Sequence, residues 1–363
     1  MCGIVGYVGD RDCADVLVDA LSKLEYRGYD SAGIAVFEKG TIKVEKCKGR
    51  LANLVDKMAV DGKPQGHCGI GHTRWATHGE PSDINSHPHG NKRVSIVHNG
   101  IIENYKQIKD FLVEEGYSFV SETDTETVAK LLDYYYVDDP VDTIIKVLSE
   151  IKGSYALGIM FRDYPDTVFA VRKESPLIVG VGENENFLAS DVPAIIKYTR
   201  DYYLLEANEI AVVKKDSVQI YDMHKEPVHK EINTADWDVD AAEKGGYEHF
   251  MLKEIHEQPA AVRDTVSPRI INGMPDLSQD GVDMQKLKDY RQIFIVACGT
   301  AMHAGMVGKY VIEKLARKPV IVDIASEFRY RDPIITKDDL MIVISQSGET
   351  ADTMAVLRLA KEV

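Results

Sequence analysis

The chain has 363 residues, of which 44% are hydrophobic and 28% charged, as is typical of a globular protein long enough for two domains. Its formal net charge of −15 argues against a nucleic-acid-binding protein, because affinity for phosphates comes largely from Lys and Arg. The five cysteines form no C-x-x-C pair, so we expect reduced thiols. The sequence shows no signal peptide and no apolar run of roughly 18 residues, so we predict a cytoplasmic location and no membrane association.

Up to about residue 235 the chain is rich in expected strands. We predict strands over residues 32–37, 41–46, 95–98, 155–161, 167–171, 177–181, 209–213 and 217–221. Helical patterns cover residues 15–25, 102–114, 124–136 and 141–151, and the third opens with a capping box formed by Thr123 and Glu126. These elements predict an α+β domain, residues 2–235, with antiparallel sheet and flanking helices.

The pattern changes after residue 235. Residues 236–284 are predicted to be a linker with one or two short helices around residues 251–266. From residue 285 onward, strands over 292–297, 320–324 and 341–344 alternate with helices over 303–315 and 353–362. Such alternation predicts an α/β domain, 285–363, with part of a doubly wound parallel sheet.

Cys2 is the first residue with a chemical hypothesis attached to it. Removal of Met1 would place its thiol on the same residue as a free α-amine. That amine has a reference pKa of about 7.7–8.0, so near neutral pH it could accept the thiol proton. The alternative is that Cys2 is an ordinary strand residue, and that Gly3 and Gly6 mark turns or bulges.

Six of the eleven histidines lie between His67 and His98. Their spacing does not match an H-E-x-x-H helix, and no carboxylate or cysteine stands at a ligand-like offset. We therefore expect no metal and no cofactor. The alternative for this stretch is a loop whose polar residues satisfy backbone groups.

Hydrolysis of an amino-acid amide by a thiol needs further groups besides the Cys2 nucleophile. Asn99 and Gly100 could donate hydrogen bonds to the oxyanion. Arg74 could bind an α-carboxylate and Asp124 an α-ammonium group. Each has another interpretation: a hairpin turn for Asn99-Gly100, a surface ion pair for Arg74 and a helix N-cap for Asp124.

Several motifs together resemble the glutaminase domain of the N-terminal-nucleophile amidotransferases. They are Cys2 to Gly6, Arg27 to Ser31, Gly71 to His89 and His98 to Asn104. The linker run Glu243 to Met251 adds a resemblance to those members of the group that act on a sugar phosphate. The resemblance covers the whole chain and implies a four-layer αββα fold for the first domain. It implies that Cys2 is the nucleophile and that Asn99 and Gly100 form the oxyanion hole.

The same resemblance implies the other roles around glutamine. Arg74 and Asp124 would bind its carboxylate and ammonium ends, while Thr77 and His78 would line the site. Arg27 resembles a residue that supports the pocket, and Trp75 a gate that covers bound glutamine.

The second domain carries a hydroxyl-rich loop from Ser345 to Thr350, directly after a strand and before a helix. Hydroxyls and backbone N–H groups at a helix N-terminus favour an anion, although an ordinary Ser/Thr cap is the alternative. The loop contains neither a G-x-G-x-x-G nor a Walker motif, which disfavours a nucleotide. The run Cys298-Gly299-Thr300 follows another strand in the same way.

These two loops resemble the sugar-isomerase fold. By that resemblance the phosphate of fructose 6-phosphate would be bound by Thr300, Ser345, Gln346, Ser347 and Thr350. The sequence departs from the family at Ala301, where serine is frequent, so one contact to a sugar hydroxyl is in question.

The resemblance implies glutamine and fructose 6-phosphate as substrates, glucosamine 6-phosphate and glutamate as products, and a homodimer in the full-length enzyme. The lysine, glutamate and histidine that such enzymes use for isomerisation would lie beyond residue 363. We therefore expect a partial sequence, competent only for glutamine hydrolysis. The alternatives are another class II amidotransferase and a non-catalytic sugar-phosphate sensor.

Overall fold

The computed structural model describes residues 2–76, 78–235, 246–346, 348 and 350–363. These form two compact units, unit 1 over Met1–Ala242 and unit 2 over Glu243–Val363. The predicted linker bounds, 236 and 284, stay a prediction, because residues 236–245 lie outside the described part.

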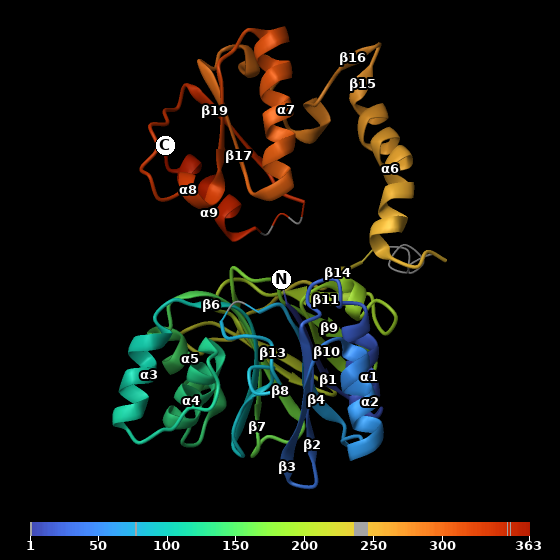
Figure 1. Cartoon of the computed structure of the whole chain (residues 1–363), viewed down its shortest axis with the longest axis vertical. Coiled ribbons are helices and arrows are strands. Elements are labelled where there is room, and N and C mark those ends of the chain that lie inside the picture. The colour runs from blue at the N-terminus through green and yellow to red at the C-terminus, as the bar shows by residue number, and fades with distance from the viewer. Residues whose placement is uncertain (1, 77, 236–245, 347, 349) are drawn as a thin grey trace. The chain divides into compact units, whose positions relative to one another are not determined.

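Unit 1 has four layers, and its helices lie on the outer faces of two antiparallel sheets (Figure 1). Within the described residues, the larger sheet has eight strands in the order β14-β11-β9-β10-β1-β4-β2-β3, and the smaller has six in the order β13-β12-β8-β7-β6-β5. The strands are β1 (Gly3–Val8), β2 (Ser31–Glu38), β3 (Thr41–Lys48), β4 (Cys68–Arg74), β5 (His89–Gly90), β6 (Val94–Ile102), β7 (Gly153–Phe161), β8 (Thr167–Lys173), β9 (Ile178–Val181), β10 (Asn186–Ala189), β11 (Asp201–Leu204), β12 (Ile210–Lys214), β13 (Val218–Tyr221) and β14 (Asn233–Thr234). The helices are α1 (Cys13–Ser22), α2 (Leu51–Asp61), α3 (Tyr105–Glu114), α4 (Asp124–Tyr135) and α5 (Pro140–Glu150).

Three hydrophobic clusters join the four layers. Leu17 of α1 and Leu54 of α2 pack on the larger sheet, and Leu132 of α4 packs on the smaller one. Between the sheets, Ile70 and Leu188 belong to a third cluster with no exposed surface at either side chain. Apolar side chains on both faces explain why strands such as β7 and β8 are nearly continuous hydrophobic runs rather than alternating patterns.

The predicted capping box is confirmed in part. The Thr123 hydroxyl accepts the N–H of Glu126 and caps α4, as expected. The Glu126 carboxylate, however, accepts the N–H groups of Val120 and Ser121 rather than that of the cap residue.

The alternative that Asn99-Gly100 forms a hairpin turn is wrong. Both residues lie in β6, where Asn99 pairs with Ala156 and Gly100 with Tyr155 of β7. Gly100 has φ +126°, and a Cβ there would lie 2.1 Å from the carbonyl oxygen of Ser154. The glycine is thus required by close backbone contact inside the sheet.

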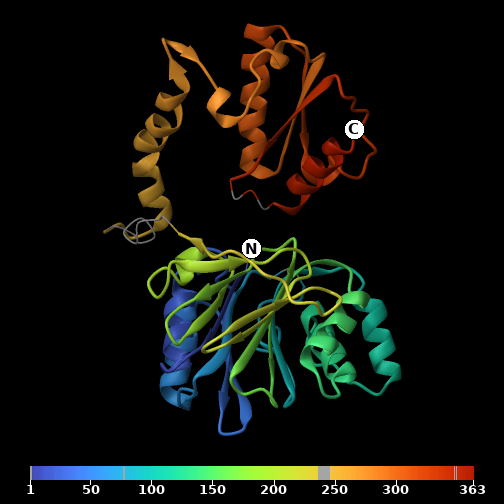
Figure 2. The same cartoon turned by 180° about the vertical axis from the view of Figure 1, so that it is seen from behind.

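Unit 2 contains a three-stranded parallel sheet in the order β18-β17-β19. Helix α7 lies on one face and α8 and α9 on the other (Figures 1 and 2). The elements are α6 (Phe250–Val266), β15 (Ile270–Ile271), β16 (Met274–Pro275), β17 (Gln292–Ala297), α7 (Gly299–Ala316), β18 (Val320–Ile324), α8 (Ala325–Phe328), β19 (Asp339–Ile344) and α9 (Ala351–Lys361). The predicted alternation of strands and helices is confirmed, and two of the three strands have the predicted bounds. Among the described residues, no helix is long and apolar enough to cross a membrane.

Candidate active site

Cys2 lies immediately before β1, at the end of the buried centre of the larger sheet. The next residue, Gly3, pairs with Thr73 of β4, so Cys2 faces the end of that strand. The N–H of Trp75 donates to the Cys2 Sγ at 3.1 Å. Burial raises the pKa of the Cys2 thiol, and the hydrogen bond from Trp75 opposes that shift.

The backbone of Cys2 is held as firmly as its thiol. Its carbonyl oxygen accepts hydrogen bonds from the Asn99 Nδ2 at 3.0 Å and from the Arg27 Nε at 3.3 Å. Arg27 is buried and forms an ion pair of 3.0 Å with Asp191. Arg27, which was expected to support the pocket, thus contacts the backbone of Cys2.

The Asn99 amide connects Cys2 to the smaller sheet. Its Nδ2 donates to the Ser190 Oγ at 2.9 Å as well as to Cys2, and its Oδ1 lies 3.0 Å from the His72 Nε2. An oxyanion would therefore compete with the Ser190 or the Cys2 oxygen for this donor.

Arg74, the last residue of β4, is buried, so the alternative of a surface ion pair is wrong. Its guanidinium donates to the carbonyl oxygens of His78, Gly79 (3.0 Å) and Glu80 (3.5 Å). Burial lowers the pKa of Arg74, while the carboxylates of Asp30 and Asp124 oppose that shift, so both carboxylates lie within electrostatic range. A bound carboxylate would replace or join the loop carbonyls at this guanidinium.

Asp124 is buried at the first position of α4, and Thr123 is the N-cap, so the N-cap alternative for Asp124 is wrong. Its Oδ2 accepts the N–H of Ile102 at 2.8 Å and lies 4.0 Å from the Nδ1 of His98.

Trp75 and His78, two further predicted residues, lie on the loop after β4. The Trp75 side chain is 50% exposed, and its ring meets that of Tyr29 edge-on at 5.5 Å. The ring of His78 lies 5.2 Å from that of Tyr105. Thr77 is outside the described residues.

Two groups that were not predicted as site residues, Asp30 and Lys46, support this loop. The Asp30 carboxylate accepts the N–H of Ala76, and the Lys46 Nζ donates to the carbonyl oxygens of Ile84 at 3.1 Å and Ser86 at 2.9 Å. Burial lowers the pKa of Lys46 to about 8. Asp30 belongs to the Arg27-to-Ser31 motif, and that motif could have indicated its role at the site. Lys46 lies on a strand, and no motif includes it.

Four histidines of the stretch from His67 to His98, namely His72, His87, His89 and His98, are buried, and three of them lie in strands. Burial lowers the pKa of each, that of His72 to about 3. In the part of the chain that the structure describes, no three His, Cys, Asp or Glu side chains are grouped to hold a metal ion. The histidines are instead neutral groups within the layers behind Cys2.

The two hydroxyl-rich loops of unit 2 leave the same edge of its sheet. Ala297 of β17 pairs with Ile344 of β19, which brings Thr300, in the first turn of α7, and Ser345 to neighbouring strand ends. The Ser345 Oγ accepts the N–H of Gly348 at 3.0 Å and lies 3.2 Å from the Thr350 Oγ1.

Thr350 is the N-cap of α9 by position, but its side chain makes no capping hydrogen bond, unlike an ordinary cap. Gln346 is exposed, and Ser347 lies outside the described residues.

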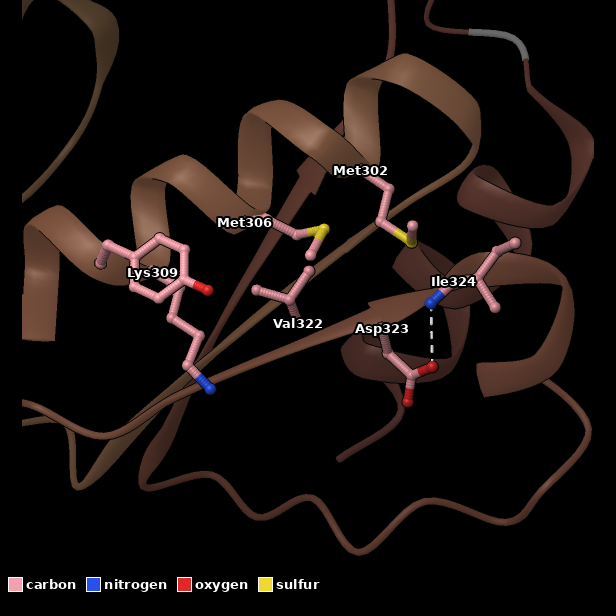
Figure 3. Close-up of a pocket in the computed structure, with 7 residues that line it drawn as sticks. Met302, Met306, Lys309, Val322, Asp323 and Ile324 are labelled. Atoms are coloured by element: carbon pink, nitrogen blue, oxygen red, sulfur yellow. Dashed lines mark hydrogen bonds between the residues drawn. The ribbon is translucent and has the colours of Figure 1, made fainter.

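A pocket lies beside these loops but contains none of the predicted phosphate-binding residues. Figure 3 shows Met302 and Met306 of α7 directed toward Val322 and Ile324 of β18, with Asp323 accepting the N–H of Ile324. The predicted sugar-phosphate residues are therefore brought together in part, at an open edge rather than in this pocket.

Comparisons with known proteins define the class of each unit. Residues 72–197 match a glutamine amidotransferase domain, and residues 286–363 match a SIS domain. Unit 1 has the N-terminal-nucleophile amidotransferase fold: the chain resembles a glutamine phosphoribosylpyrophosphate amidotransferase from B. subtilis with TM-score 0.57 and 19% identity, over 95% of this chain and 69% of that one. At that identity the similarity concerns the fold alone.

The sequence is much more similar to another group. It is 59% identical to the glutamine–fructose-6-phosphate aminotransferase [isomerizing] of Clostridium acetobutylicum, over 100% of this chain and 60% of the relative. It is 47% identical to the enzyme of the same name from Thermus thermophilus, over 99% of this chain and 59% of the relative. The chain is thus homologous along its length to glutamine–fructose-6-phosphate aminotransferases and spans about 60% of their length.

Proposed function

We propose that unit 1 hydrolyses glutamine through a thioester on Cys2, and that the whole protein transfers the ammonia to fructose 6-phosphate, giving glucosamine 6-phosphate and glutamate. The observation that carries the proposal is the placement of Cys2, whose thiol accepts the N–H of Trp75 and whose carbonyl oxygen accepts the Asn99 amide, both of them predicted site residues.

The mechanism follows from the groups around Cys2. After removal of Met1, the α-amine takes the thiol proton, and the sulfur attacks the side-chain amide carbon of glutamine. Asn99 and Gly100 donate to the oxyanion, which then collapses, breaks the C–N bond and releases ammonia with the transferred proton. Water hydrolyses the thioester to glutamate and regenerates the thiol.

Recognition of glutamine rests on two charges of opposite sign. Arg74 binds the α-carboxylate and Asp124 the α-ammonium group, while Thr77 and His78 line the site. Trp75 covers it, and the exposed indole is compatible with a gate. The proposed gate and ligand contacts share one loop, which Arg74, Asp30 and Lys46 hold by its backbone.

In unit 2 we propose that Thr300, Ser345, Gln346, Ser347 and Thr350 bind the sugar phosphate. The paired strand ends of β17 and β19 support this assignment, as does the N-cap Thr350, whose hydroxyl makes no capping hydrogen bond among the described residues. We also propose that the full-length enzyme is a homodimer. A sugar-phosphate sensor would not need the Cys2 arrangement.

Glutamate release from glutamine tests the proposal. Cys2→Ala removes the nucleophile and should reduce the rate to background, as should retention of Met1, which blocks the amine. Cys47→Ala is the matched control, because Cys47 is also a free, half-buried thiol but lies on β3, away from these contacts. A parent-like rate in Cys2→Ala would refute the mechanism.

A further inference from the structure

His72 contacts the proposed catalytic amide from inside the protein. It lies in β4, pairs with Ile4 of β1, and has no exposed surface. Its Nε2 lies 3.0 Å from two oxygens, the backbone carbonyl of His98 and the Oδ1 of Asn99.

These contacts determine which ring nitrogen carries the proton. A backbone carbonyl can only accept, so the contact with His98 requires hydrogen on the Nε2 of His72. The other ring nitrogen, Nδ1, is buried and has no partner among the described residues. A proton there would lack an acceptor, so the ring is neutral, with its hydrogen on Nε2. The low pKa of His72, caused by burial, agrees with this state.

The tautomer in turn determines the orientation of the Asn99 amide. The single hydrogen on the His72 Nε2 is shared between the His98 carbonyl oxygen and the Asn99 amide. An NH₂ group facing it would set two donors against each other, so the amide atom that faces Nε2 must be the oxygen. At the opposite end the carbonyl oxygen of Cys2 can only accept, so the nitrogen must face it. The carbonyl oxygens of His98 and Cys2 therefore determine the orientation of the Asn99 amide independently, and both give the same orientation.

We propose that His72 is a positioning residue: as a neutral Nε2–H donor it holds the Asn99 amide with its N–H groups directed toward Cys2. This inference rests on the proposed function and deepens it, because a reversed amide would present oxygen to the developing oxyanion. Ser190 also contacts this amide, because its Oγ accepts hydrogen bonds from the Asn99 Nδ2 and from the backbone N–H of Ile4. The amide of Asn99 is thereby tied to the nucleophile's own strand.

A double-mutant cycle on the turnover number tests the coupling. His72→Phe keeps a flat ring beside His87, which stacks on His72 at 4.1 Å, but removes the donor. Loss of an oxyanion donor costs about 10²–10³-fold in kcat, so Asn99→Ala should fall in that range. We expect His72→Phe to lower kcat about 10-fold or more with KM little changed, and to lower it no further in the Asn99→Ala background.

Two more variants separate positioning from general stability. His72→Gln retains an N–H donor and should recover part of the loss. His89→Phe removes another buried histidine, whose Nε2 contacts Thr123 rather than Asn99, so any effect should multiply with that of Asn99→Ala. If the effects of His72→Phe and Asn99→Ala multiply in the same way, the proposal is wrong.

NMR of the ¹⁵N-labelled chain tests the contact without reference to activity. The His72 ring should show the Nε2–H tautomer at pH 7, and the side-chain amide signals of Asn99 should move in His72→Phe but not in His89→Phe. A charged or Nδ1–H ring, or unmoved signals in His72→Phe, would overturn the inference. A parent chain without glutaminase activity would instead refute the proposed function, and these spectra would still decide on His72.

Discussion

The central strands of unit 1, β1 and β4, are buried along their whole length, whereas every residue of β19 in unit 2 is only half-buried. In α7 only Gly305 is buried, although the helix has 18 residues. Unit 1 therefore holds its candidate site by packing on several sides, while unit 2 presents its hydroxyl groups at the end of a thin sheet. The two candidate sites therefore differ in burial as well as in residue type.

The largest expected effect comes from a cavity in unit 2. Phe328 is fully buried and meets Phe294 at 5.8 Å in a small cluster. Phe328→Ala should cost about 3–5 kcal/mol, comparable to the whole stability of a small domain. Hydrogen exchange should then show unit 2 unprotected and unit 1 unchanged.

Phe169→Ala is the matched control in unit 1, where the same truncation is made in a much larger core. Phe169→Ala should lower the stability of unit 1, but the backbone amides of that unit should stay protected from hydrogen exchange. Equal loss of protection in both variants would contradict the proposed difference between the units.

The next effect concerns recognition of glutamine. Arg74→Ala removes a buried guanidinium, so affinity for a glutamine analogue should fall by about 2–4 kcal/mol. Asp124→Asn should act similarly through the ammonium end. Calorimetry measures both, and Arg50→Ala, which removes an exposed arginine stacked on Tyr29, serves as the control. Unchanged affinity in either variant would exclude that residue from the site.

An effect that appears only in acid follows from the buried histidines. The folded-state pKa of His72 is about 3, against about 6.5 in the unfolded chain, so below pH 6.5 the unfolded state binds the proton preferentially. The contribution of neutral His72 to the free energy of unfolding is therefore fully present above that pH. It is lost as pH falls toward 3, by about 1.4 kcal/mol per pH unit. His87, His89 and His98 shift in the same direction and add to the loss.

Unit 2 provides the comparison, because its described histidines, His249, His256 and His303, are exposed. Hydrogen exchange at pH 7 and pH 5 should therefore show the stability gap between the units narrowing in acid. A gap that stays constant would mean that the histidines are not held neutral.

Patterns local in sequence were predictable. Apolar runs predict the parallel strands β17 and β18. The turn from Glu38 to Gly40 predicts the hairpin of β2 and β3. Strand β4 was not predicted, because its polar residues resemble a loop until β1 and β2 cover both of its edges. Helix α2 was also missed, although its buried residues Leu51, Leu54 and Met58 follow a helical spacing.

Residues of the candidate site that belong to a sequence motif were predictable. Residues that reach the site only through tertiary contacts were not. Cys2, Arg74, Asn99 and Asp124 belong to recognisable runs, but their predicted roles stay predictions. His72 and Ser190 carried no signal of their own. They meet Asn99 only because β1 pairs with β4 and Ser190 follows β10, at residues far apart in the sequence.

The central claim is that Cys2 is the nucleophile and unit 1 holds it ready to react. The most direct test is mass spectrometry of the N-terminal peptide after treatment with a diazoketone analogue of glutamine. We predict one adduct, on the Cys2 sulfur, that glutamine prevents and that disappears when Met1 is retained. An adduct on Cys13, Cys47, Cys68 or Cys298 with Cys2 unmodified would contradict the account.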